Sequence, residues 1–331
     1  MTTTTATSPK IVFYDLAFYP GAPLASPNTW LTRLCLLHKR IPFEVVEPNL
    51  LDRGPTSLGK RLGKSPLFPV IQVSPPLEKQ RGDNDADGDG AGATDKDDDV
   101  EYVEDSFQIA LYLDRHFGAH PIFQPNLERV DMSDPSWPTI LSMATILKHG
   151  YATSDSMWNK LFHLAAPGLG EIADAVEDPS FAAYFRSDQR HGKGGWAKIV
   201  GMDLETMLVD TRRSFLPFEE VLKSQSTSSR DEGARFLTTP SHVGIVDFLV
   251  FSRWAMVKAC SPALADALVD ADPGPMRAYL AQAAGKRIDE EEGEWWGDVR
   301  LDHFARWKER MLDLWDGAPR KALQRKGPRE L

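Results

Sequence analysis

Cysteine is almost absent from this sequence, which has only Cys35 and Cys260 in 331 residues. The two lie far apart and within helical patterns, so a disulfide framework is not expected and a reducing compartment fits. We expect both thiols to be buried and inert. The sequence also lacks a GxSxG motif, and its eight histidines show no HExxH spacing and no accompanying cysteine cluster. It therefore predicts neither serine-hydrolase chemistry nor a metal site.

Long apolar runs are missing as well. The first ten residues, MTTTTATSPK, contain no apolar segment of a secretion signal, and no later run reaches the roughly 18 apolar residues that a membrane span needs. Positive charge is also scarce, because 38 Lys and Arg stand against 48 Asp and Glu for a net charge of -10. These features predict a cytoplasmic protein with no membrane and no nucleic-acid partner.

What the first 120 residues do contain is an alternation of short β-rich runs and helical patterns. The expected strands are residues 10–16, 43–46, 69–73 and 101–104, and the expected helices are residues 26–39, 56–62 and 106–117. The resulting order, β-α-β-α-β-β-α, is the one that a thioredoxin-like domain needs. A βαβ crossover pairs parallel strands, and the final β-β connection adds an antiparallel edge.

The remainder of the chain reads as helical. Apolar residues recur at helical spacing in residues 137–147, 157–164, 202–222, 243–257, 275–283 and 301–315. We therefore expect an α+β/α two-domain protein, with a disordered tail at 1–9, a thioredoxin-like domain at 10–120 and an all-α domain at 121–331. The apolar stripe of the last helix (Phe304, Trp307, Met311 and Trp315) favours docking on the core over lining a substrate pocket.

A Gly/Asp-rich tract interrupts the thioredoxin-like pattern at about residues 77–100. Between Glu78 and Glu101 it carries ten acidic and three basic residues, a net charge of -7. Such a composition cannot bury enough apolar surface to fold, so we expect a disordered loop. Its start imitates a calcium-binding loop, but the twelfth position is Thr94 instead of the bidentate glutamate.

The start of the first helix is the most informative place for chemistry. Ser26 and Pro27 suit the N-cap and first turn, where free amides and the helix dipole favour an anion. A serine hydroxyl there can donate a hydrogen bond to a thiolate and lower the pKa of the thiol. The simpler interpretation is that Ser26 only caps the helix.

Two other segments fit the same site. A cis Phe68–Pro69 bond at the start of the third strand would leave the backbone N–H and C=O of Phe68 free to pair with a peptide. Asp105 and Ser106 join the fourth strand to its helix, and this N-terminus suits a carboxylate while Asp105 suits an ammonium group. A γ-glutamyl group carries both charges.

These segments resemble the glutathione-site segments of glutathione transferases, especially of the etherase-related fungal branch. The resemblance rests on residues 26–34 (SPNTWLTRL), 68–71 (FPVI) and 103–113 (VEDSFQIALYL). Residues 182–186 (AAYFR) and 240–253 (PSHVGIVDFLVFSR) support it, and it covers about residues 10–262.

The resemblance implies a role for each matching residue. Ser26 would activate the thiol with Asn28 as an auxiliary donor, and Phe68, Pro69 and Val70 would clamp the peptide backbone. Asp105 and Ser106 would bind the γ-glutamyl group. Glutathione is then the co-substrate of a small hydrophobic electrophile, of aryl-ether type in one version, in detoxification or secondary metabolism. No metal is implied, and a homodimer is an expected assembly.

The sequence departs from the family pattern at one helix cap. The family's core helix usually begins with a Ser/Thr-x-x-Asp box, but Gly244 occupies the cap position before Asp247. We expect this to weaken the cap by a few tenths of a kcal/mol.

Two other functions compete with the transferase. A non-catalytic ligand-binding or regulatory protein could keep the fold. A glutaredoxin-like reductase would need a nucleophilic cysteine where Ser26 stands, and Cys35 lies well down the helix.

Overall fold

The computed structural model describes residues 9–48, 58–74, 100–149, 156–225, 235–284 and 299–325. Its sheet has four strands in the order β2-β1-β3-β4. The strands are β1 (Lys10–Tyr14), β2 (Phe43–Val46), β3 (Val70–Ser74) and β4 (Glu101–Glu104). β1 runs parallel to β2 and antiparallel to β3, and β3 runs antiparallel to β4. The mixed sheet that the sequence predicts is therefore confirmed.

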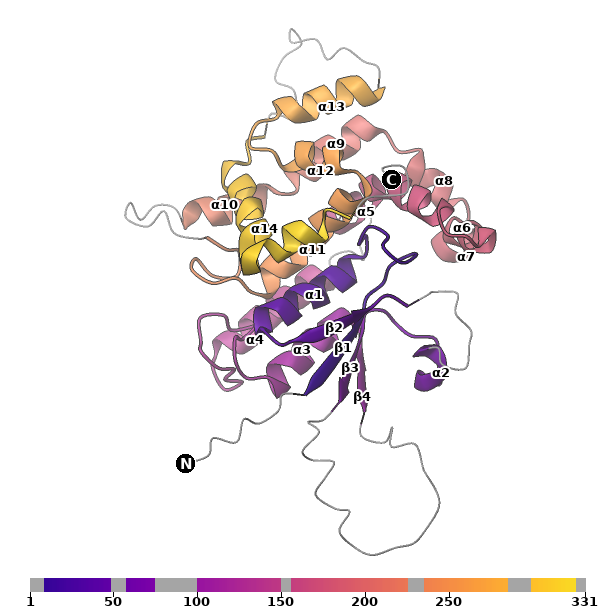
Figure 1. The fold of residues 1–331 in the computed structure, drawn as a ribbon. Helices are drawn as coiled ribbons and strands as arrows, with labels where there is room; N and C mark the ends of the chain where they lie inside the picture. The colour runs from indigo at the N-terminus through magenta and orange to yellow at the C-terminus, as the bar shows by residue number, and fades with distance from the viewer. Residues whose placement is uncertain are drawn as a thin grey trace, which may run out of the picture.

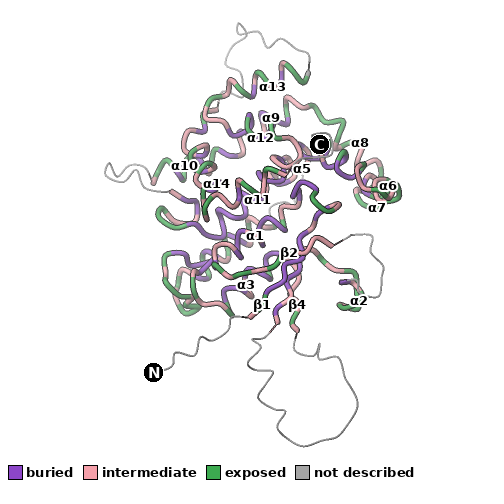
Figure 2. Tube along the Cα trace, in the orientation of Figure 1, coloured by how far each residue is buried: buried purple, intermediate pink, exposed green. Residues whose placement is uncertain are grey.

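The side-chain alternation of the strands explains how the sheet is covered. Ile11 and Phe13 point into the main core, where α1 (Pro27–Lys39) and α3 (Ser106–His116) pack. Val12 and Tyr14 point to the other face and form a small cluster with Leu58 of α2 (Leu58–Leu62). Both faces of the sheet are thus used, as the buried strands in Figure 2 show.

Most of the rest of the described chain is helical, and most of its helices lie beyond α1 from the sheet, as Figure 1 shows. Its helices are α4 (Ser136–His149), α5 (Met157–Asp174), α6 (Pro179–Phe185), α7 (Asp188–His191), α8 (Gly195–Val200), α9 (Leu204–Arg213), α10 (Leu216–Ser224), α11 (Ile245–Cys260), α12 (Pro262–Val269), α13 (Gly274–Ala284) and α14 (Asp302–Ala322). The predicted fold class, a thioredoxin-like domain followed by helices, is confirmed.

Several predicted helices differ from the observed ones. The helix that starts at Met157 continues through Pro167 to Asp174, and the single helix predicted for residues 202–222 is wrong because the chain breaks between α9 and α10. The sequence analysis missed α6, α7, α8 and α12, which are all short. α14 extends past Trp315, but its backbone leaves the helical region between Leu314 and Gly317.

Helix α1 connects the two parts of the molecule. One side of it covers the sheet, and the other packs on α11, where the Trp30 and Phe251 rings meet edge to face at 6.1 Å between centroids. The Trp30 indole also donates to the Leu24 carbonyl at 2.6 Å. Phe304, Trp307 and Met311 of α14 are fully buried, which confirms the expected docking on the core for these three residues, whereas Trp315 is only partly buried.

The start of α11 corrects our expectation for its cap. Thr238 comes from the preceding loop, and its hydroxyl accepts the Val246 amide at 3.2 Å and donates to Asp247 at 2.7 Å. A Cβ on Gly244 would lie 2.8 Å from Thr238 Cγ2 and 3.0 Å from the Ile122 carbonyl. Thr238 therefore supplies the hydroxyl that the box lacks, and only glycine leaves room for it.

Parts of three sequence predictions lie outside the described residues. They are the disordered tail, of which residues 1–8 are outside, the acidic loop, of which residues 77–99 are outside, and the first two residues of the helix predicted at 56–62. The two cysteines are described. Cys35 is fully buried and Cys260 partly so, and burial raises the pKa of both thiols, which keeps them protonated.

Candidate functional site

The register of the sheet brings two of the three predicted segments to one edge. Tyr14 at the end of β1 lies opposite Val70 at the start of β3, which lies opposite Glu104 at the end of β4. Phe68–Pro69 and Asp105–Ser106 therefore leave the sheet at the same edge. The loop after β1 also leaves there and returns to the start of α1, so Ser26 joins them (Figure 1).

Ser26 is the N-cap of α1, as the Ser-Pro sequence predicts. Its hydroxyl oxygen accepts the Thr29 amide at 3.4 Å, and its carbonyl accepts the Thr29 hydroxyl at 3.0 Å. The 3.4 Å contact is longer than a typical N–H···O bond, and it leaves the hydroxyl proton of Ser26 free to donate. Asn28 lies in the same first turn and is exposed. Both predicted donors thus face the end of the helix where an anion is favoured.

The Phe68–Pro69 peptide bond is cis, as the sequence analysis expected. Phe68, just before β3, is partly buried, whereas Pro69 and Val70 are buried. Val70 pairs with strands on both sides. The neighbouring Leu67 amide is held by Glu104 at 2.8 Å, which ties this turn to the end of β4.

Asp105 caps α3 with a backbone φ of 70°, in the left-handed region that non-glycine residues rarely adopt. Its Oδ1 accepts the Phe107 amide at 2.9 Å and the Gln108 amide at 3.1 Å. Ser106, the first residue of α3, is 2% exposed. A non-glycine residue held at such a φ is a common feature of functional sites.

The sequence analysis missed Lys148, which lies in the last turn of α4. Its Nζ is 2.8 Å from Asp105 Oδ1 and 4.9 Å from the centre of the Phe107 ring. The contact gives Asp105 a charged partner even without a γ-glutamyl group. No local motif marks Lys148, because it meets Asp105 only through packing of α4 on the N-terminal part.

The loop that leads to Ser26 is held on both sides. The Gly21 amide donates to Glu47 at 3.0 Å, and Arg325 near the described C-terminal end pairs with the same carboxylate. Phe18 meets Phe181 of α6 edge to face at 5.5 Å. The Tyr19 hydroxyl is buried without a partner among the described residues, and burial raises the pKa of its phenol.

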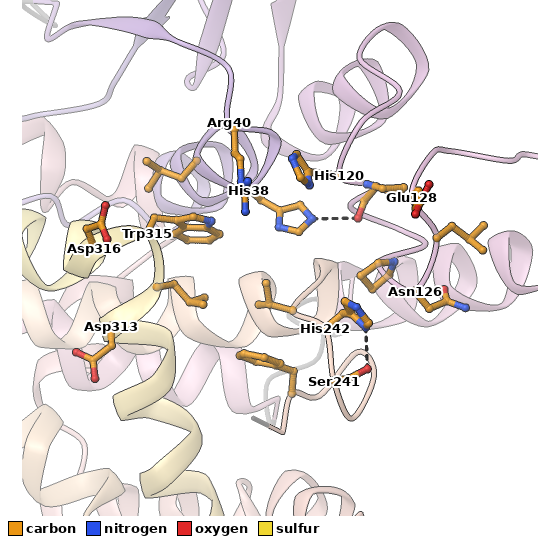
Figure 3. Close-up of a pocket in the computed structure, with 17 residues that line it drawn as sticks. His38, Arg40, His120, Asn126, Glu128, Ser241, His242, Asp313, Trp315 and Asp316 are labelled. Atoms are coloured by element: carbon orange, nitrogen blue, oxygen red, sulfur yellow. Dashed lines mark hydrogen bonds between the residues drawn. The ribbon is translucent and has the colours of Figure 1, made fainter. Parts of the chain in front are cut away.

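A cavity of about 1000 Å³ lies elsewhere, at the opposite end of α1 (Figure 3). His38 and Trp315 line it, and Nε2 of His38 lies 3.1 Å from the Pro121 carbonyl. Arg40, His120 and Asp316 also line it, and these three residues and Trp315 all have a positive φ. A helix of α1's length spans roughly 20 Å, so this cavity is separate from the Ser26 end.

Comparison with solved structures identifies the arrangement. Glutathione transferase GSTFuA2 from Phanerochaete chrysosporium superposes with a TM-score of 0.52 at 20% identity, covering 85% of this chain and 100% of that one. GSTFuA3 from the same fungus gives a TM-score of 0.50 at 16% identity, covering 95% of each chain. The chain has the glutathione transferase fold.

A third glutathione transferase is relevant to the site. CsGST83044 of Ceriporiopsis subvermispora, solved in complex with glutathione, gives a TM-score of 0.51 at 20% identity, covering 83% of this chain and 98% of that one. No family model matches the sequence of this chain, and no curated protein matches it. The relationship to glutathione transferases is therefore carried by the fold.

Two features are absent from the described residues. No helix in that part of the chain is long and apolar enough to cross a membrane. Within the same residues, no group of three or more His, Cys, Asp or Glu side chains is arranged to hold a metal ion.

Proposed function

We propose that this protein is a glutathione transferase that ionises the thiol of glutathione for attack on a small hydrophobic electrophile. The observation that carries the proposal is the shared sheet edge, where Ser26, Phe68 and Asp105 come from three separate segments of the chain. The fold supports it, since solved proteins of this fold include a glutathione complex.

Each segment has a distinct role in the proposed complex. Backbone groups of Phe68, beside the buried Pro69 and Val70, pair with the peptide of glutathione, and Asp105 and Ser106 hold its γ-glutamyl end. The cysteinyl sulfur then lies at the start of α1, where Ser26 donates to it and Asn28 is a second donor. Each unit by which the thiol pKa falls corresponds to about 1.4 kcal/mol in favour of the thiolate.

The transfer itself is a nucleophilic displacement. The thiolate forms a C–S bond to the electrophilic carbon, and the bond to the leaving group breaks with its electron pair. In the aryl-ether version the leaving group is an aryloxide, which takes up a proton. Phe18 and Phe181 supply aromatic surface where the Ser26 loop meets α6, which supports an apolar aromatic second substrate. The proposal includes a cytoplasmic role in detoxification or secondary metabolism.

A titration and a substrate screen test this function. Calorimetric titration with glutathione should give saturable binding to the wild-type protein. A screen of aryl ethers, epoxides and halogenated aromatics should then give glutathione conjugates in the presence of the protein. Absence of glutathione binding contradicts the proposal, whereas binding without turnover on any electrophile favours the second candidate.

That second candidate is a non-catalytic protein that keeps the fold. The contact between Lys148 and Asp105 favours it, because an ion pair at 2.8 Å gives Asp105 a structural role even without a ligand. Ser26 likewise has a role as an N-cap without any thiolate.

We also propose that the protein assembles as a homodimer. Helix α4 leaves Met143 39% and Ile146 72% exposed, and such apolar surface is commonly covered by a partner. Sedimentation equilibrium of the wild type and Ile146→Glu tests this, because the variant should be monomeric. A monomeric wild type would contradict it.

A further inference from the structure

The ion pair between Lys148 and Asp105 joins the two parts of the molecule at the candidate site. Asp105 follows β4 and caps α3, while Lys148 belongs to the last turn of α4. Their side chains are 31% and 17% exposed, so the pair is partly shielded but open on one side. An aromatic face, that of Phe107, lies under the lysine at 4.9 Å. Lys148 is therefore held in place and still accessible from solution.

The hydrogen bonds of Asp105 all use one of its two oxygens. Oδ1 accepts the amides of Phe107 and Gln108 and the ammonium of Lys148. Oδ2 has no hydrogen-bond partner among the described residues. A ligand can thus bind Oδ2 without displacing Lys148 or uncapping α3.

The groups around Lys148 can bind an anion. An ammonium has three donors, and for Lys148 the contact to Asp105 is the one hydrogen bond that the described residues provide. Ser106, whose residue is 2% exposed, adds a side-chain hydroxyl. Its amide is the first of α3 and has no acceptor within the helix. These donors lie at the positive end of the α3 dipole.

A side-by-side carboxylate and ammonium are complementary to an α-amino acid zwitterion, whose own ammonium and carboxylate sit on one carbon. We propose that Lys148 binds the α-carboxylate of the γ-glutamyl group, together with Ser106, while Asp105 Oδ2 accepts its ammonium. This inference rests on the proposed function. It makes Lys148 a specificity-determining residue supplied by the helical part, and it makes glutathione a bridge between the two parts of the protein.

Two glutathione analogues test the ammonium and the α-carboxylate of the γ-glutamyl group separately. Glutaryl-cysteinylglycine lacks the ammonium, and 4-aminobutanoyl-cysteinylglycine lacks the α-carboxylate. Wild type should bind each at least tenfold more weakly than glutathione. Lys148→Met should bind glutathione ten- to hundredfold more weakly than wild type does. It should bind 4-aminobutanoyl-cysteinylglycine no more weakly than wild type does, because that analogue has no carboxylate to lose.

Control variants exclude a general structural effect. Lys148→Arg keeps a cation and should retain most glutathione affinity. Lys258→Met breaks a comparable ion pair, in which Nζ lies 2.6 Å from Asp266, away from the candidate site, and should leave every affinity unchanged. Thermal melting checks that each variant folds.

These measurements separate a failure of the role of Lys148 from a failure of the proposed glutathione transferase function. If the wild type binds no glutathione, the proposed function fails and the inference with it. Should the wild type bind glutathione while Lys148→Met binds it equally well, only the inference is overturned. The same holds if Lys148→Met loses affinity for 4-aminobutanoyl-cysteinylglycine as strongly as for glutathione, since the loss would then not involve the carboxylate.

Discussion

Lys39 and Asp114 form an ion pair of 2.6 Å with neither side chain exposed to solvent. Lys39 also donates to the Phe117 carbonyl at 2.6 Å, and Asp114 accepts the amides of Ile122 and Phe123. The pair thereby joins α1 to α3 and fixes the segment that leads into the helical part. It is a buried network in which each charge is compensated by the other and by backbone groups.

Breaking this pair should destabilise the protein strongly. Asp114→Asn leaves the buried Lys39 ammonium without its counter-charge, which typically costs about 3–5 kcal/mol. The matched control is Asp266→Asn, which breaks the more exposed pair with Lys258 and should cost less than about 1 kcal/mol. The free energy of unfolding from urea titration measures both. Equal losses would show that burial of the Lys39 pair adds nothing.

Gly244→Ser tests the start of α11. At an ordinary helix start, serine would improve the cap by a few tenths of a kcal/mol. Here the new Cβ would meet Thr238 Cγ2 at 2.8 Å and Pro125 Cγ at 3.0 Å, so we expect a loss of about 1–3 kcal/mol. Gly118→Ser, with open space around the new Cβ, is the control. Thermal denaturation that shows Gly244→Ser to be as stable as wild type would refute the role given to Thr238.

The start of α11 illustrates what the sequence could and could not predict. The strands and the helices that begin at Pro27 and Ser106 follow local patterns of apolar residues and caps, so they were predictable. The roles of Thr238 and Lys148 depend on contacts between distant segments, which no spacing reveals. The helices α6 to α8 are four to seven residues long and too short for a helical period to stand out.

His38 should make stability depend on pH. Burial, with a smaller effect from the charges of Lys39, His120 and Arg40, lowers the pKa of its imidazole from 6.5 to about 4, although the hydrogen bond to the Pro121 carbonyl acts in the opposite direction. Between these two pH values the unfolded chain binds a proton at His38 that the folded chain does not. The contribution of neutral His38 to stability is therefore fully present above pH 6.5 and is lost as pH decreases toward 4. Between pH 7 and pH 5 we expect a loss of about 2 kcal/mol.

His38→Phe isolates that effect, because it keeps an aromatic ring against Phe248 and removes the titrating group. Urea titrations at pH 7 and pH 5 should show a smaller loss of stability for the variant than for wild type. An identical pH dependence of the two proteins would rule out His38 as the cause.

Asp105→Asn should separate binding from stability. Asparagine caps a helix as well as aspartate, and the ion pair with Lys148 is partly exposed, so unfolding should change by less than about 1 kcal/mol. Loss of the charged acceptor should weaken glutathione binding by about 1.5–3 kcal/mol, roughly ten- to hundredfold. Asp203→Asn, at the N-cap of α9, is the matched control. Calorimetry that finds equal glutathione affinity in wild type and Asp105→Asn would remove Asp105 from the site.

The central claim is that Ser26 stabilises the thiolate of bound glutathione, and a titration of that thiolate tests it most directly. Ultraviolet absorbance of the bound thiolate, followed against pH, should give a thiol pKa well below the value of about 8.5 for a free thiol. In Ser26→Ala, loss of one hydrogen bond to a charged group should raise that pKa by about 1–2 units while glutathione still binds. A bound thiol that titrates like free glutathione in the wild type, or identically in both proteins, would contradict the account.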